Sequence, residues 1–237
     1  MDNFLSKQRL LVISPHADDE VFGCAGTIAK IKDYGGKVFV MLMSIGDLKQ
    51  YYTKGKIIKA STREKEFVKT MKFLKADDYD IIFKEEYEHL RLDSMPRRDL
   101  IAIIERESRV SIEKTRPSIV AIPSISYNQD HEAVFRAGFT ACRPHLENVR
   151  PFPKIILAYD NPTHFWNVER EKFHPNFYVD ISQYFNIKLQ ALKLHASQAK
   201  PKLHYLSVEN LADLSRLRGR EVSVKAAEAF MSYRFVL

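Results

Sequence analysis

Uninterrupted apolar runs alternate with segments of helical periodicity along most of the chain, and this alternation limits the possible folds more than any other feature. Strands are expected at 10–14, 37–44, 79–83, 118–123, 155–159 and 177–181, with a closing strand at 232–236. Helices are expected before the Gly35-Gly36 pair and at about 62–75, 97–113, 130–142, 182–193 and 222–231.

Strands that are apolar throughout are typical of a parallel sheet that helices cover on both faces. We therefore expect an α/β fold: a Rossmann-like, mainly parallel sheet with helices on both faces. The length of 237 residues suits one substantial core and is marginal for two. A single domain over residues 1–237 is the expectation.

Composition narrows the class of protein. The N-terminus is too polar for a signal peptide, and no apolar run approaches the roughly 18 residues of a membrane span. Cys24 and Cys142 do not make a disulfide framework, so the reducing cytoplasm is the expected location. The net charge of +7 fits either an anionic partner or a solvated, lysine-rich surface. No basic-aromatic recognition motif supports a nucleic-acid partner, and the oligomeric state stays open.

Polar clusters follow three of the predicted strands. They are PHADDE at 15–20, SIGD at 44–47 and YNQDH at 127–131. The carboxyl ends of parallel strands meet at one edge of a sheet, where such sheets bind ligands. Acids stand where a dinucleotide-binding chain would carry its glycine-rich loop after the first strand, which favours a cation over a nucleotide phosphate.

A zinc site is the chemistry that this pattern favours. His16 and Asp19 are three residues apart at a strand-to-helix turn, and His131 follows another strand of the same sheet. Two histidines and one carboxylate leave a position open for water, as in catalytic zinc sites. Asp18 would then act as general base, and Asp130 would fix or tune a neighbouring group. The alternative is that the acids stabilise a helical turn and Asp18 is an ordinary cap.

Two longer segments, PHADDEVFGCAGT (15–27) and YNQDHEAVFRA (127–137), carry a resemblance to a known family. They are similar to the two metal motifs of the PIG-L/LmbE-like family of zinc-dependent N-acetylglucosaminyl deacetylases. Five further segments resemble family motifs in the same order: TREKEF (62–67), RLDS (91–94), RPSIVAIPS (116–124), KLQALKLHASQ (188–198) and AEAF (227–230).

The resemblance implies a hydrolase that removes the N-acetyl group from an amino-sugar conjugate of the N-acetylglucosamine type. His16, Asp19 and His131 would hold Zn²⁺, although iron or cobalt would accept the same ligands. Metal-bound water would be the nucleophile, with Asp18 as its base. Three further residues align with positions near the sugar, each with an alternative role: an ion pair with Glu66 for Arg63, a turn for Asp93 and a structural role for His195.

Asn128 departs from the family pattern, which has a histidine at this position. An amide cannot be a general acid, but it can donate a hydrogen bond to an oxyanion. The candidate catalytic residues are therefore Asp18, Asn128 and Asp130. Three outcomes stay open: Asp18 carries the proton both ways, another group (Tyr127, His164 or His195) replaces the histidine, or the chain is a zinc-bearing binding protein with weakened or lost catalysis.

The basic charge favours an acidic substrate, such as a sugar linked to a phosphate, a nucleotide or a phospholipid. Four aromatic residues could rim the pocket and stack on a sugar ring: Tyr51, Tyr52, Phe165 and Trp166.

Overall fold

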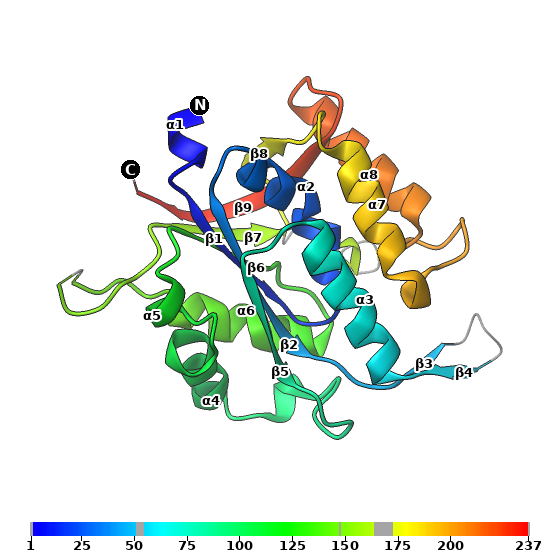
Figure 1. Ribbon diagram of the computed structural model, residues 1–237, viewed down its shortest axis with the longest axis horizontal. Helices are drawn as coiled ribbons and strands as arrows, with labels where there is room; N and C mark the ends of the chain where they lie inside the picture. Colours follow the sequence, from blue (N-terminus) through cyan, green and yellow to red (C-terminus); the bar gives the residue numbers. More distant parts are fainter. Residues whose placement is uncertain (1, 51–54, 147, 164–172, 237) are drawn as a thin grey trace.

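The computed structural model describes residues 2–50, 55–146, 148–163 and 173–236. Seven strands form one sheet in the order β5-β2-β1-β6-β7-β9-β8 (Figure 1). The strands are β1 (Arg9–Ser14), β2 (Lys37–Ser44), β5 (Asp78–Phe83), β6 (Ile119–Pro123), β7 (Ile155–Tyr159), β8 (Phe177–Asp180) and β9 (Ala227–Phe235). The strands from β5 to β7 pair in parallel, and β9 runs antiparallel to both β7 and β8. The predicted mainly parallel sheet is confirmed.

Helices cover both faces of this sheet, because its central strands are apolar on both sides. Leu10 and Val12 of β1 pack in one core cluster with α2, α3, α7 and α8, whereas Leu11 and Ile13 pack in the other with α4, α5 and α6. The helices are α1 (Asp2–Leu5), α2 (Asp19–Asp33), α3 (Ala60–Phe73), α4 (Arg97–Ala102), α5 (Ile112–Thr115), α6 (Gln129–Ala141), α7 (Phe185–Leu194) and α8 (Val208–Glu221).

The parallel part of the sheet has the strand order of a Rossmann fold. Numbered along the chain, its five strands lie in the order 3-2-1-4-5. The order reverses between β1 and β6, and ligands of open α/β sheets bind beyond the carboxyl ends of the strands at such a reversal. The PHADDE segment follows β1 and the YNQDH segment follows β6, so both polar clusters lie at this point.

The prediction of a helix over 222–231 is wrong. Residues 227–231 belong to β9, and the helix of this region is α8, which begins after Ser207. The Ser207 side chain accepts a hydrogen bond from the amide of Asn210 and so caps α8. Ala227–Phe230 instead pair with β8, and Phe230 also pairs with Tyr159 of β7. Sheet pairing outweighs the helical propensity of an Ala-Glu-Ala sequence.

The continuous helix predicted over 97–113 is also wrong. It divides into α4, a π-helical turn (Ile103–Glu107) and α5. Ser108 leaves the helix with an extended backbone, and its hydroxyl donates to Asp80 at 2.8 Å. A small antiparallel pair, β3 (Leu48–Gln50) and β4 (Lys56–Ile58), was not predicted at all.

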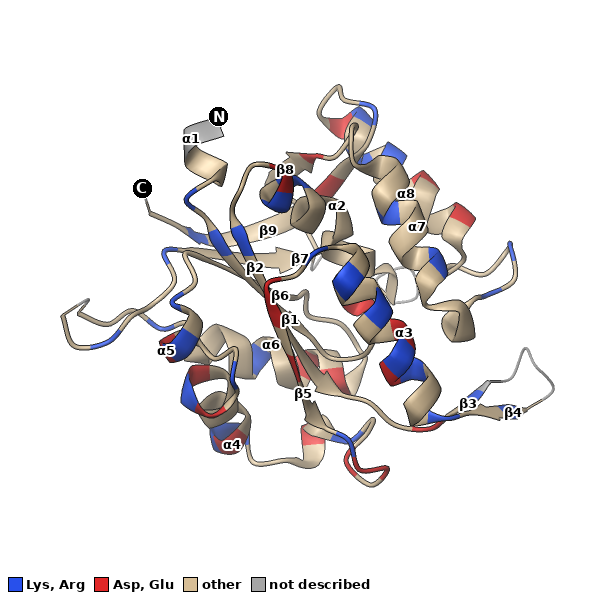
Figure 2. Ribbon diagram, viewed as in Figure 1, with Lys and Arg blue, Asp and Glu red and all other residues tan. Residues whose placement is uncertain are grey.

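Charged side chains of both signs lie on the helices (Figure 2), and both cysteines are buried. In the view of Figure 2, Lys and Arg are interspersed with Asp and Glu over α3, α4, α5 and α8. Cys24 and Cys142 are both buried and free, and burial raises the pKa of the Cys142 thiol to about 12. Within the described ranges, every helix is too short or too polar to cross a membrane.

Candidate metal centre

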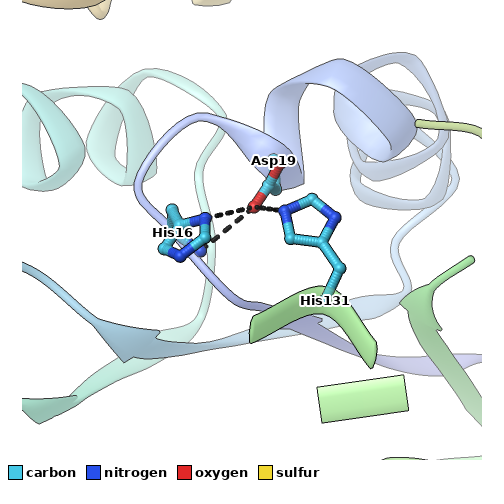
Figure 3. A group of neighbouring side chains, drawn as sticks. All are labelled: His16, Asp19 and His131. Carbon is cyan, nitrogen blue, oxygen red and sulfur yellow. Dashed lines mark hydrogen bonds and ion pairs between the residues drawn. The ribbon is translucent and has the colours of Figure 1, made fainter. Parts of the chain in front are cut away.

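His16, Asp19 and His131 meet at the carboxyl edge of the sheet, with the two imidazole rings on either side of the Asp19 carboxylate (Figure 3). Oδ2 of Asp19 lies 3.5 Å from Nδ1 of His16 and 3.1 Å from Nε2 of His131. Ligands about 2.1 Å from a tetrahedral ion would be roughly 3.4 Å apart, so these separations suit one shared ion. The donor set, two imidazoles and one carboxylate, fits a divalent transition metal.

Asp130 fixes the orientation of His16. Its Oδ2 lies 2.9 Å from Nε2 of His16, and its Oδ1 accepts a hydrogen bond from the backbone amide of Leu92 at 2.9 Å. Nδ1 of His16 is therefore the nitrogen that faces Asp19. Burial disfavours a charged His16, but Asp130 and Asp19 outweigh burial and raise the pKa of His16 to about 9. The surroundings favour positive charge at this point, which agrees with a cation site.

Asp19 carries the negative charge of the cluster. Burial would raise the pKa of Asp19, but His131 and His16 outweigh burial and hold this pKa well below its usual range. Asn161 also donates to Oδ1 of Asp19 at 3.0 Å, and its Nδ2 lies 3.3 Å from Nδ1 of His131. The sequence interpretation missed Asn161. An Asn-Pro pair directly after the strand at 155–159 was the available signal, because that strand ends at the same edge.

Asp18 lies beside the cluster without joining it. It occupies the N-cap position of α2, yet its side chain makes no capping hydrogen bond, so the alternative that Asp18 is an ordinary cap is wrong. Its backbone is in a strained conformation at a φ of 134°, and its amide donates to Oε2 of Glu20. Burial and the charge of Asp19 raise the pKa of Asp18 to about 7, against the opposing charges of His195 and Arg63.

Arg63 is buried on α3, and its guanidinium faces the site. Its Nη1 donates to the Gly46 carbonyl at 2.9 Å and lies 2.8 Å from Nε2 of His89. The alternative role for Arg63 was an ion pair with Glu66. The Glu66 carboxylate instead accepts from the amide and hydroxyl of Ser197. Nε of Arg63 is buried without a hydrogen-bond partner in the described part of the chain.

His89 is a second residue that the sequence interpretation missed. Its ring lies between Arg63 and Ser44, with Nδ1 3.1 Å from the Ser44 hydroxyl. Burial and the Arg63 charge lower the pKa of His89 to about 3, so the ring is neutral and accepts from Arg63. A Cβ at Gly46 would lie 2.5 Å from that of His89, which explains the glycine in the SIGD segment.

Asp93 and His195 lie on the walls of two different cavities. Asp93 is exposed in a short 3₁₀ helix (Leu92–Ser94) beside a polar cavity of about 390 Å³. His195 is buried, with Nε2 3.1 Å from Oε1 of Glu20, and it lines a cavity of about 160 Å³ together with Asp18. His195 therefore has both a structural partner and a place beside the site.

Asn128 is the N-cap of α6. Its Oδ1 accepts from the backbone amides of Asp130 at 3.0 Å and His131 at 3.3 Å. Tyr127, beside it, is about half exposed. The other candidates, His164, Phe165, Trp166, Tyr51 and Tyr52, lie outside the described residues.

Known proteins are similar to this chain in sequence and in fold. A probable N-acetyl-alpha-D-glucosaminyl L-malate deacetylase 2 of Bacillus anthracis is 26% identical over 86% of this chain and 87% of its own length. The structure of an N,N'-diacetylchitobiose deacetylase from Pyrococcus horikoshii aligns over 99% of this chain and 86% of its own, with a TM-score of 0.68 and 22% identity.

The fold alone does not decide the reaction. A 4-carboxy-2-hydroxymuconate hydratase from Pseudomonas putida KT2440 aligns with a TM-score of 0.73 over 97% of this chain and 98% of its own, at 19% identity. The sequence is more specific, because residues 11–142, more than half of the chain, match the family model described as PIG-L, GlcNAc-PI de-N-acetylase. The chain belongs to the PIG-L family.

Proposed function

We propose that the protein is a metal-dependent N-deacetylase that releases acetate from an N-acetylated amino sugar. The observation that carries this proposal is the buried cluster of His16, Asp19 and His131 with the carboxylate of Asp18 beside it. Relatives named as deacetylases of N-acetylated sugars support the same reaction. The substrate is a small amino-sugar conjugate, and the net charge of +7 favours a phosphate- or nucleotide-linked one.

His16, Asp19 and His131 would hold the ion, and zinc is the metal that this donor set suits best. When bound, the ion would polarise the acetamide carbonyl and lower the pKa of water. Asp130 keeps His16 oriented toward the ion through the 2.9 Å bond to Nε2.

Asp18 takes the proton of the attacking water. A base with a pKa near the working pH is the most effective, and the pKa of Asp18 is raised to about 7. Nδ2 of Asn128 is not used by the helix cap, so it can donate to the oxyanion that forms on the carbonyl. Asp18 then returns its proton to the leaving nitrogen. His195 is the second candidate for this last step, because Glu20 outweighs burial and raises the pKa of His195.

The test begins with the purified protein. Bound metal is determined by elemental analysis, and acetate release is followed from N-acetylglucosamine and its phosphate, nucleotide and lipid conjugates, with and without a chelator. Acetate release that the chelator abolishes is the expected result. If the protein holds stoichiometric metal but releases no acetate from any conjugate, the result would favour the other candidate, a metal-bearing binding protein. The observation behind this second candidate is Asn128, which replaces the family histidine.

Three variants separate the assigned roles. Asp18→Asn should keep the metal and lower turnover by roughly 10²–10⁴-fold, since it removes the base alone. His131→Ala should lose both metal and turnover. Asp213→Asn is the matched control, because Asp213 is an exposed carboxylate on α8 that pairs with Arg216. Full turnover in Asp18→Asn would mean that Asp18 is not the base.

A further inference from the structure

Two cavities of opposite character lie at the candidate metal centre. The polar cavity, of about 390 Å³, is lined by Asp93, Arg97, Gln129, Glu132 and Arg136 together with apolar neighbours. The second cavity, of about 160 Å³, has Asp18 and His195 on its wall and is otherwise largely apolar; its apolar side chains include Phe22, Leu192, Leu206, Val208 and Leu211. We call this second one the apolar cavity. No described residue lines both.

Residues next to the candidate metal ligands line each of the two cavities. On one side, Asp130 joins His16 to the backbone of Leu92, which lines the polar cavity. On the other side, Asp18 directly precedes the ligand Asp19 and lines the apolar cavity. A substrate whose amide bond lies beside Asp18 can therefore extend its acyl end into the apolar cavity.

The two ends of an N-acylated amino sugar differ in the same way as the cavities. The sugar carries hydroxyl groups that need hydrogen-bond partners, which charged and amide side chains supply. The acyl chain carries none and gains from burial against apolar side chains. This complementarity assigns the acyl chain to the side of Phe22 and Leu206.

Three helices fix the size of the apolar cavity. Phe22 comes from α2, Leu192 from α7, and Val208 and Leu211 from α8. Leu192 and Leu211 also belong to the main core cluster, so these walls are held in place by packing. A cavity of roughly 150 Å³ lined by apolar side chains accommodates benzene, which has six carbon atoms. The single methyl group of an acetamide would leave most of the apolar cavity unfilled.

We propose that the apolar cavity is the acyl-binding site and that it selects acyl chains of about four to six carbons over acetyl. This inference rests on the proposed N-deacylation at the same centre. The substrate class is thereby an amino sugar with a short, apolar N-acyl chain.

The experiment compares N-acetyl-, N-butanoyl-, N-hexanoyl- and N-octanoylglucosamine, with release of the free amine as the readout. Each buried methylene should raise kcat/KM by about three- to fourfold up to hexanoyl, and octanoyl should fall below hexanoyl because it exceeds the cavity. Leu206→Trp fills the cavity and should lower the ratio of hexanoyl to acetyl kcat/KM by at least about tenfold. Leu217→Trp, an exposed position on α8, is the control and should keep the wild-type ratio.

Two outcomes would overturn the assignment while leaving the deacetylase proposal in place. One is an acetyl substrate that is cleaved as fast as the hexanoyl substrate or faster. The other is a wild-type ratio in Leu206→Trp. If Leu206→Trp does not fold by circular dichroism, Val208→Phe fills the same cavity from α8 and replaces it.

If no substrate is cleaved, a binding measurement tests the acyl-binding site separately from the deacetylase proposal. The metal-loaded protein is titrated calorimetrically with N-hexanoyl- and N-acetylglucosamine, for the wild type and for Leu206→Trp. Tighter hexanoyl binding that the variant loses supports the acyl site even without turnover. Equal affinity for the two ligands overturns it.

Discussion

The Asn128 side chain uses its two polar atoms differently. Oδ1 caps α6 through the amides of Asp130, which orients His16, and of His131, which is a proposed metal ligand. Nδ2 is the atom that can face a substrate oxyanion. A histidine lacks an oxygen acceptor of this kind and is a poor N-cap, so substitution at this position changes the helix as well as the chemistry.

Variants of Asn128 distinguish the cap from the donor. Asn128→Asp keeps an oxygen that can cap α6 but loses the amide donor, so we expect an unchanged Tm and a 10²–10³-fold loss of turnover. Asn128→His loses the cap, at a cost of about 1 kcal/mol, and should lower Tm by about 2–4 °C. Thermal unfolding and acetate release measure the two effects, with metal content determined for each variant. Undiminished turnover in Asn128→Asp would exclude the amide as an oxyanion donor.

Proximity of the metal ligands could be predicted from the sequence because each stands at a strand end. The strand order alone brings His16, Asp19 and His131 together, and the strands themselves can be found from apolar runs in the sequence. Asn161 carried the same kind of signal, because it closely follows the strand at 155–159, whereas His89 lies six residues beyond the end of β5 and could not be identified in this way. The place of His89 depends on how the segment after β5 folds back over the sheet edge, which is a tertiary property.

A buried ion pair joins three elements behind the site. Nζ of Lys188 on α7 lies 2.8 Å from Oε1 of Glu228 on β9 and also donates to the Phe22 carbonyl of α2. Glu228 further accepts from the amides of Gly26 and Thr27 in α2. Both side chains are almost completely buried. The pair therefore anchors α2, whose first turn presents Asp18 and Asp19.

Breaking this pair should destabilise the whole fold. Glu228→Gln leaves the buried Lys188 charge without the opposite charge of the carboxylate, and we expect a loss of about 3–5 kcal/mol in the free energy of unfolding. Glu209→Gln, an exposed glutamate in the first turn of α8, should change it by less than about 0.5 kcal/mol. Urea unfolding measures both. Adding Lys188→Met to Glu228→Gln should recover part of the loss, and a double variant less stable than Glu228→Gln would contradict the ion-pair explanation.

The same contacts explain which elements the sequence could predict. The central strands are apolar on both faces, so their positions follow from local composition alone. Only the second half of β9 could be found in this way, as the strand expected at 232–236, because the Ala-Glu-Ala-Phe segment of its first half favours a helix locally. The buried Glu228 of that segment is paired with the distant Lys188 and with α2. The start of α8 carried a usable signal, the Ser207 cap before an amphipathic run.

At the scale of the whole molecule, the metal centre joins parts of the chain that are far apart in sequence. His16 and Asp19 come from the β1–α2 turn, His131 comes from α6, and Asn161 follows β7. These residues come together in the folded protein, so an ion that they hold binds the folded state and not the unfolded chain. Metal binding should therefore stabilise the entire sheet rather than one turn.

Removal of the metal should lower the stability of the protein without unfolding it. Without an ion, His16 is still paired with Asp130 and His131 with Asp19, so each histidine keeps a polar partner. At free zinc 100 to 1,000 times Kd, we expect a stabilisation of about 2.7–4.1 kcal/mol.

Asn161→Ala should weaken metal affinity by about 10–100-fold and reduce this gain by about 1.4–2.7 kcal/mol. Unfolding with and without a chelator measures the difference, and His131→Ala, which should show none, is the control. A metal-dependent gain that persists in His131→Ala would place the ion elsewhere in the molecule.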